Sequence, residues 1–288
     1  MAARAPLPLP RTLSMASGLV ARLEADEITG DGIILLVDGA EQSHVDVADQ
    51  RRVFYEYLQR IAHVLASLCP PQPRVLHLGA GAMTLPRALG MTHPGSRHVV
   101  VDRERELMDF VLRYVPLPEP LRAARTATLT TALEARMTAG ADGADVVPVI
   151  ADAKDYVEAA LRGDGEGFDA IVLDIFTGRD SPEHLADPSF YAMLHRALAA
   201  KGTLVVNLGD DEGMHFARAQ IRALQAEFGD VLASGESTLF SGRYPGNIIA
   251  AATDQPFPPA VVDRLRAAGP HPATVLSGPE LDGFARDR

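Results

Sequence analysis

The sequence contains a single cysteine, Cys69, and no tryptophan among its 288 residues. One cysteine cannot form an intramolecular disulfide or a cysteine-based metal cluster, and a chain without disulfides fits a reducing compartment. No apolar run approaches the roughly 18 residues that a membrane span needs. Pro6, Pro8 and Pro10 interrupt the apolar stretch that an N-terminal signal would require. We therefore expect a cytoplasmic protein without a membrane partner.

Basic residues are outnumbered. The chain has 27 lysines and arginines against 38 aspartates and glutamates, which gives a formal net charge of −11. Such a chain offers no broad basic surface, so we expect no nucleic-acid partner. An acidic surface would attract cationic small molecules such as amines, although mildly acidic soluble proteins are also common. The histidines show no metal-ligand spacing, so we expect no metal site.

Strands and helices alternate regularly through the middle of the chain. This pattern predicts an α/β fold with a doubly wound, mostly parallel, Rossmann-like sheet over residues 71–254. Residues 121–139 read as a further helical piece within it. Residues 255–288, which are rich in proline, are expected to pack against this domain as a C-terminal extension.

A smaller unit is predicted before the main domain. An apolar run ends at Asp38-Gly39, a typical hairpin turn, and predicts a small antiparallel β-hairpin region. A helical pattern follows, with Asp49 as a candidate N-cap. We expect residues 1–17 to be a flexible arm and residues 18–70 to hold the hairpin and the helix.

The stretch from Arg74 to Asp102 predicts a strand, a glycine turn, a helix and a second strand. Gly79 and Gly81 permit a tight turn and the close approach of a ligand. Asp102 ends the second strand, where a carboxylate commonly binds the hydroxyls of a ribose. The dinucleotide pattern would need a third glycine where Thr84 stands, so a nucleoside without a pyrophosphate, such as S-adenosylmethionine, fits better. An ordinary crossover without a ligand is the alternative.

Two more acids fall at predicted strand ends. Asp152 follows one strand, and Asp174 lies near the end of the most apolar strand in the chain. Ligands of doubly wound sheets bind beyond the carboxyl ends of the strands, so both acids are candidate site residues. A helix-capping role is the alternative for each.

In this order, these residues resemble the spermidine synthase family, the polyamine aminopropyltransferases, whose core is the class I methyltransferase fold. The similarity covers about residues 30 to 252. It implies that Gln42, Gly79, Gly81, Asp102 and Asp152 bind the nucleoside. It also implies catalytic roles for Asp174, which would accept a proton from the attacking amine, and for Tyr55, which matches the family's gate tyrosine.

Three positions depart from the family pattern. Ala82 stands where the family has an aspartate in its glycine loop, Glu56 replaces a histidine beside the gate tyrosine, and Thr177 replaces a second acid. Two anchors for cationic amines are therefore missing, and the nucleoside half of the site is better preserved than the amine half.

Three functions remain open at this stage. The first is aminopropyl transfer from decarboxylated S-adenosylmethionine to an amine. The second is methyl transfer from S-adenosylmethionine to a small molecule, which Ala82 favours because the missing acid would leave room for the carboxylate of that donor. The third is nucleoside binding without catalysis. The resemblance also implies a homodimer or homotetramer that uses the N-terminal hairpin region.

Overall fold

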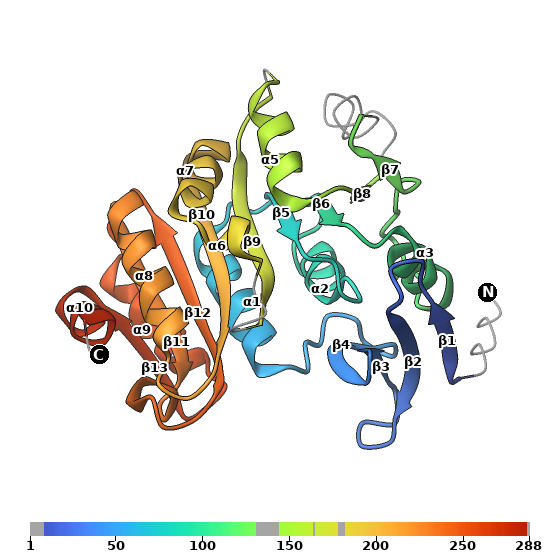
Figure 1. Ribbon diagram of the computed structural model, residues 1–288, viewed down its shortest axis with the longest axis horizontal. Coiled ribbons are helices and arrows are strands. Elements are labelled where there is room, and N and C mark those ends of the chain that lie inside the picture. Colours follow the sequence, from blue (N-terminus) through green and yellow to red (C-terminus); the bar gives the residue numbers. More distant parts are fainter. Residues whose placement is uncertain (1–8, 131–143, 164, 178–181, 287–288) are drawn as a thin grey trace.

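The computed structural model describes residues 9–130, 144–163, 165–177 and 182–286. It contains a small antiparallel sheet and a large mixed sheet with helices on both faces (Figure 1). This architecture confirms the predicted α/β class and the predicted Rossmann-like sheet.

The small sheet is a four-stranded meander rather than a single hairpin. Its strands, in spatial order, are β1 (Arg11–Ser14), β2 (Val20–Asp26), β3 (Gly32–Val37) and β4 (Ala40–Asp46). Asp38 and Gly39 both have positive φ, 49° and 81°, as the two central residues of a type I′ hairpin turn require. β1 pairs with β2, so the expectation of a flexible arm through residue 17 is wrong for residues 11–14.

The main sheet has nine strands in the order β13-β11-β12-β10-β9-β5-β6-β8-β7. In chain order they are β5 (Arg74–Leu78), β6 (Arg97–Asp102), β7 (Ala127–Thr128), β8 (Val146–Ile150), β9 (Phe168–Thr177), β10 (Leu198–Asp210), β11 (Asp230–Glu236), β12 (Gly246–Thr253) and β13 (Ala273–Ser277). The pairs from β10 to β7 are parallel, whereas β12, β11 and β13 join antiparallel.

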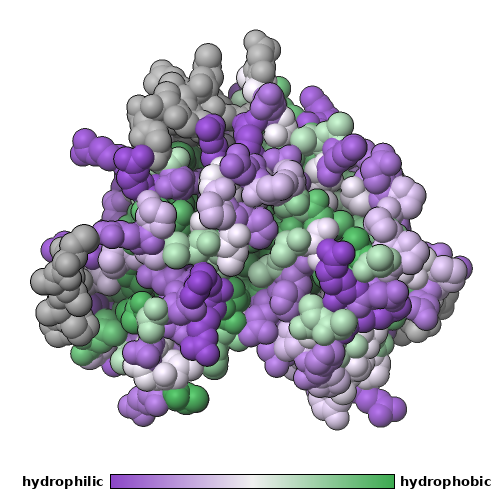
Figure 2. Space-filling model, turned by 180° about the vertical axis from the view of Figure 1, so that it is seen from behind, coloured by the Kyte–Doolittle hydropathy of each residue, from purple (hydrophilic) through white to green (hydrophobic). Residues whose placement is uncertain are grey.

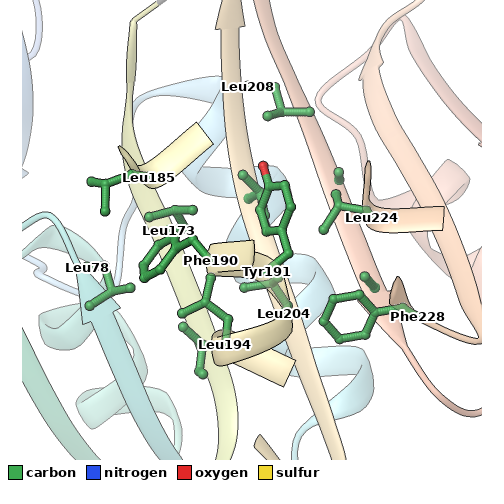
Figure 3. Packing of buried hydrophobic residues seen from close by; sticks show 14 of the residues in the cluster. Leu78, Leu173, Leu185, Phe190, Tyr191, Leu194, Leu204, Leu208, Leu224 and Phe228 are labelled. Carbon is green, nitrogen blue, oxygen red and sulfur yellow. The ribbon is translucent and has the colours of Figure 1, made fainter. Parts of the chain in front are cut away.

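Helices cover both faces of this sheet. They are α1 (Glu56–Leu68), α2 (Thr84–Thr92), α3 (Arg105–Tyr114), α5 (Ala153–Leu161), α6 (Glu183–Ala186), α7 (Pro188–Ala197), α8 (His215–Glu227), α9 (Pro259–Ala268) and α10 (Gly278–Arg286). α1, α2 and α9 bury apolar residues against one face, and α5, α7, α8 and α10 against the other. Figure 3 shows Phe190 and Leu194 of α7 packed beside Leu173 of β9 in the second of these cores.

α1 and the C-terminal residues belong to the main domain. α1 packs on the main sheet in the same core as α9, and the small sheet instead packs on α3 through residues such as Leu23 and Phe110. β13 pairs with β11, so residues 255–286 complete the domain rather than extend it. The predicted division at residues 70 and 254 is corrected accordingly.

Two local predictions also need correction. Asp49 does not cap α1, because the helix begins at Glu56 with Tyr55 as an N-cap that makes no side-chain bond. Asp49 instead accepts hydrogen bonds from the backbone and the guanidinium of Arg51. Residues 121–128 run without a helix and include β7, and the predicted piece from residue 131 on lies outside the described residues. Within the described parts of the chain, no helix has the length and apolarity to cross a membrane.

The topology fixes where a ligand can bind. The chain runs from β5 outward through β6 and β8, and then returns to form β9 on the other side of β5. This reversal opens a crevice at the carboxyl ends of β5 and β9, as in other doubly wound sheets.

Candidate active site

A cavity of about 490 Å³ lies at this crevice. One wall comes from the small sheet, through residues such as Leu35 and Gln42, and the other from the loops after β5 and β6 and from β9. Seen from behind in Figure 2, the surface is hollowed between two lobes of the molecule. The strand ends that carry the predicted nucleoside-binding and catalytic residues therefore face the small sheet.

The glycine loop after β5 forms the floor of the cavity. Gly79 has a φ of +101°, and a Cβ at this position would lie 2.3 Å from the carbonyl oxygen of Asp174. Glycine is therefore required both for the backbone conformation and for the contact between β5 and β9. Gly81 has a φ of +47°, and its Cβ would lie 2.3 Å from Ser43 Oγ of the small sheet. The loop ends at Met83, a buried residue held at a φ of 57°, which is unusual for a residue with a side chain.

Asp102 ends β6 where the sequence predicts it. Its two carboxylate oxygens accept the backbone N–H groups of Ala80, at 3.1 Å, and Glu104, at 2.9 Å. Burial raises the pKa of Asp102, and these two hydrogen bonds oppose that rise. Asp102 lines both the large cavity and a smaller one of about 200 Å³. A ribose held by Asp102 would therefore sit where the two cavities meet.

Asp152 lines the smaller cavity together with Pro182 and Leu185. It caps α5 by accepting the N–H of Lys154 at 2.8 Å, so the capping alternative is correct for one of its oxygens. The other oxygen lies 3.0 Å from His184 Nε2. Hydrogen bonds from His184 and Lys154 outweigh partial burial and lower the pKa of Asp152.

Asp174 is held by two neighbours that the sequence did not single out. Asn207 Nδ2 of β10 donates to Asp174 Oδ1 at 2.8 Å, and the Tyr57 hydroxyl, in the first turn of α1, also donates to this carboxylate. Burial raises the pKa of Asp174, and both hydrogen bonds oppose the rise. Alternate residues of a strand share a face, which places Asp174 and Asn207 on the side of the sheet that α1 covers.

The second tyrosine lies at the other wall. The Tyr55 hydroxyl donates to Glu41 Oε2 of β4 at 2.9 Å. The rings of Tyr55 and Tyr57 stack, with centroids 6.2 Å apart and planes at 17°. Gln42, Tyr55 and Asp174 all line the same cavity, but Tyr57, rather than Tyr55, touches the candidate base.

The large cavity is anionic. Its described lining includes four carboxylates, and none of its described lining residues is a lysine or an arginine. The carboxylates belong to Glu41, Asp102, Glu104 and Asp174. A cavity with this lining favours cationic ligands and leaves an anionic group without a charged partner.

The three departures from the family pattern take different positions. Ala82 is 1 % exposed, does not line the cavity, and its backbone N–H donates to Ser43 Oγ at 3.0 Å. Glu56 is exposed and lies 3.9 Å from the guanidinium of Arg60. Thr177 ends β9, and its side chain is outside the described part of the structure. Among the described residues, no group of three or more histidine, cysteine or acidic side chains could hold a metal ion.

Sequence patterns gave different signals for the residues that were missed. Asn207 interrupts the apolar run TLVVNLG of β10, and a polar residue near the end of a buried strand is a usable signal. Tyr57 and Glu41 gave none, because an aromatic residue on an amphipathic helix usually packs in the core and an acid beside a hairpin turn is usually solvated.

No family model matches the chain. Among characterised proteins, it is 27% identical over 160 residues to a polyamine aminopropyltransferase of Vibrio vulnificus. The aligned region covers 54% of this chain and 44% of the relative. The chain is 25% identical over 154 residues to an N-terminal histidine N-methyltransferase of Emericella nidulans, which covers 53% of this chain and 23% of the relative. The matches thus span less than half the length of either relative.

Solved structures match over more of the chain. A probable spermidine synthase from Corynebacterium glutamicum superimposes with a TM-score of 0.80 and 24% identity over 97% of this chain and 95% of that one. Human methyltransferase-like protein 13, in complex with SAH, gives a TM-score of 0.54 at 17% identity, over 81% of this chain and 92% of that one. The chain therefore has the fold that spermidine synthases share with methyltransferases, and about half of its sequence is similar to a polyamine aminopropyltransferase.

Proposed function

We propose that the chain transfers an aminopropyl group from decarboxylated S-adenosylmethionine to an amine. The observation that carries this proposal is the charge of the large cavity, where four carboxylates and no described lysine or arginine surround the space beyond β5 and β9. Both reactants of such a transfer are cationic, since one is a sulfonium with a primary amine and the other is an ammonium at neutral pH.

Asp102 and Asp152 would hold the nucleoside. Asp102 lies at the junction of the two cavities and would bind the ribose hydroxyls. Asp152 would accept a hydrogen bond from the adenine amino group in the smaller cavity. The sulfonium substituent would then point toward Asp174, as the shared cavity allows.

Asp174 would prepare the acceptor. It takes a proton from the ammonium, and the freed nitrogen lone pair attacks the carbon next to the sulfonium sulfur. The new C–N bond forms as the C–S bond breaks. The electron pair of the broken C–S bond stays on the sulfur, which becomes a neutral thioether. The raised pKa of Asp174 makes it a stronger base than an ordinary aspartate, and Tyr57 and Asn207 fix its orientation.

Methyl transfer is the second candidate. It is favoured by the similarity to an N-terminal histidine N-methyltransferase and to methyltransferase-like protein 13. However, S-adenosylmethionine carries a carboxylate, which would meet no lysine or arginine among the described residues of the cavity. Ala82 does not open room for that carboxylate, because it is buried and its amide is already bonded to Ser43.

Calorimetric titration with the two sulfonium donors separates these functions. We expect decarboxylated S-adenosylmethionine to bind at least ~10-fold more tightly, because a desolvated and unpaired carboxylate costs about 1–3 kcal/mol. Preference for S-adenosylmethionine would favour methyl transfer, and no binding of either donor would refute both transferases. As a control, Asp102→Ala should weaken both donors by about 1–3 kcal/mol, because it removes charge-assisted hydrogen bonds to the ribose.

A further inference from the structure

Two carboxylates of the large cavity, Glu41 and Glu104, have no role in the chemistry above. Glu41 lies on β4 of the small sheet, on the wall opposite the nucleoside loops. Its Oε2 accepts the Tyr55 hydroxyl at 2.9 Å. Glu104 differs from it, because Glu104 also lines the smaller cavity and accepts the hydroxyl of Ser17 at 3.1 Å. Glu41 lines the large cavity but not the smaller one, so it is the carboxylate that remains available to a second ligand.

Two tyrosine and carboxylate pairs stand side by side in this cavity. Tyr55 donates to Glu41, Tyr57 donates to Asp174, and the two rings stack 6.2 Å apart at an angle of 17°. Burial is the main cause that raises the pKa of both tyrosines, so both hydroxyls remain protonated donors. Each of the two stacked tyrosines thus binds a different carboxylate, and both carboxylates line a single cavity.

Asn207, beside Asp174, offers a free acceptor for a hydrogen-bond donor of a ligand. Asn207 is 5% exposed and lines the cavity. Its Nδ2 donates to Asp174, whereas its Oδ1 is buried without a hydrogen-bond partner. A buried acceptor without a donor is costly, and an N–H group of a bound amine would satisfy it.

We propose that Glu41 binds the remote ammonium group of a diamine acceptor while Asp174 and Asn207 hold the nitrogen that is alkylated. This inference rests on the proposed function and assigns the specificity of the same site. Glu41 lies on β4, whereas the family positions are occupied by Ala82 in the loop after β5 and by Thr177 at the end of β9. The chain would thus recover a second anionic anchor from the small sheet.

Equilibrium binding of amines tests this assignment directly. The wild-type protein, saturated with the thioether nucleoside product, is titrated with a short linear diamine and with the monoamine of the same carbon chain. We expect the diamine to bind ~10-fold or more tightly than the monoamine, as a charge-assisted hydrogen bond provides. Glu41→Gln should remove most of this difference and leave monoamine affinity within about twofold.

A matched variant and a kinetic readout complete the experiment. Glu27→Gln removes the same charge from a turn of the small sheet outside the cavity, and it should leave both affinities unchanged. In turnover, Glu41→Gln should raise the KM for the diamine and leave kcat nearly unchanged, because Glu41 contacts no reacting atom. An equal loss of diamine affinity in Glu27→Gln and Glu41→Gln, or an unchanged diamine preference in Glu41→Gln, would overturn the role of Glu41 but not the proposed function. Failure of the wild type to bind any amine would overturn the proposed function as well.

Discussion

At the scale of residues, the environment of Asp174 determines what the site can do. Burial raises the pKa of this carboxylate, and hydrogen bonds from Asn207 and Tyr57 lower it again. The balance leaves the pKa above the ordinary value of 3.8. A group of this kind can accept a proton from an ammonium better than a solvated aspartate can, at the cost of activity at low pH.

Removing the Tyr57 hydroxyl should shift the pH dependence of turnover. Because that hydrogen bond lowers the pKa of Asp174, Tyr57→Phe should raise the pKa further and move the acid limb of kcat/KM to higher pH. Tyr55→Phe is the matched control, since Tyr55 bonds to Glu41, and its acid limb should stay in place. The full pH profile of each variant provides the measurement.

A second variant links this shift to Asp174. Asp174→Asn should keep nucleoside binding and lower turnover by ~10²- to 10⁴-fold, as expected for a lost general base, and the part of the acid limb that belongs to the carboxylate should disappear. Full turnover in the Asp174→Asn variant would contradict the assignment, as would equal pH shifts in the two tyrosine variants.

The positions of the acids that line the two cavities were predictable because strand ends are visible in a sequence. Asp102 and Asp174 follow apolar runs, and parallel strands bring such ends to one edge of the sheet. Tyr57 was not predictable, because whether Tyr55 or Tyr57 reaches Asp174 depends on where α1 begins. Glu41 was not predictable either, because its contact with Tyr55 depends on how the small sheet packs against the main domain.

At the scale of elements, local polar contacts explain the misplaced boundaries. Asp46 accepts the backbone N–H groups of Ala48 and Asp49, and Gln59 donates to the carbonyl groups of Val53 and Phe54. These bonds stabilise an irregular approach to α1 where the apolar spacing alone predicted a helix. β13 was missed because five residues between prolines and a helix give little periodicity, and β11 supplies their partner.

One ion-pair cluster joins three elements and gives the stability a pH dependence. His195 of α7 lies 2.8 Å from Glu227 at the end of α8 and 2.9 Å from Asp254 after β12. Partial burial lowers the pKa of His195, but the hydrogen bonds and charges of Asp254 and Glu227 together raise it above 6.5. A histidine with a raised pKa in the folded state stabilises that state fully below its unfolded pKa, and this contribution fades as pH rises through the folded pKa.

His195→Gln should therefore destabilise the protein in a pH-dependent way. We expect a loss of about 1 kcal/mol or less in the free energy of unfolding at a pH near ~5.5, and a smaller loss near ~8.5, because the ring is 29% exposed and partly screened. Urea unfolding at both values measures this difference. His271→Gln, at an exposed histidine, should show no such trend. A loss that grows with pH would contradict the assigned sign.

At the scale of the whole molecule, the site forms between two structures that the sequence predicts separately. The main sheet supplies Asp102 and Asp174, and the small sheet lines the same cavity with Gln42 and Glu41. Ser43 Oγ, which accepts the amide of Ala82, joins the small sheet to the glycine loop. Periodicity predicted both sheets, but it carries no information on their mutual packing, which decides how the amine half of the site is built.

The net charge of the molecule leads to the last prediction. A chain with a formal charge of −11 and a cavity lined by carboxylates attracts cations over distances that salt shortens, to about 10 Å at 0.1 M ionic strength. We expect kcat/KM for a diamine to fall several-fold as ionic strength rises from ~0.02 to ~0.5 M, with a shallower fall for a monoamine and little change in kcat. Glu41→Gln should lower kcat/KM for the diamine at every salt concentration while keeping most of the slope, because it removes one contact and leaves the long-range field. A flat salt dependence for the diamine, or equal slopes for the two amines, would show that the acidic surface does not guide the acceptor into the cavity.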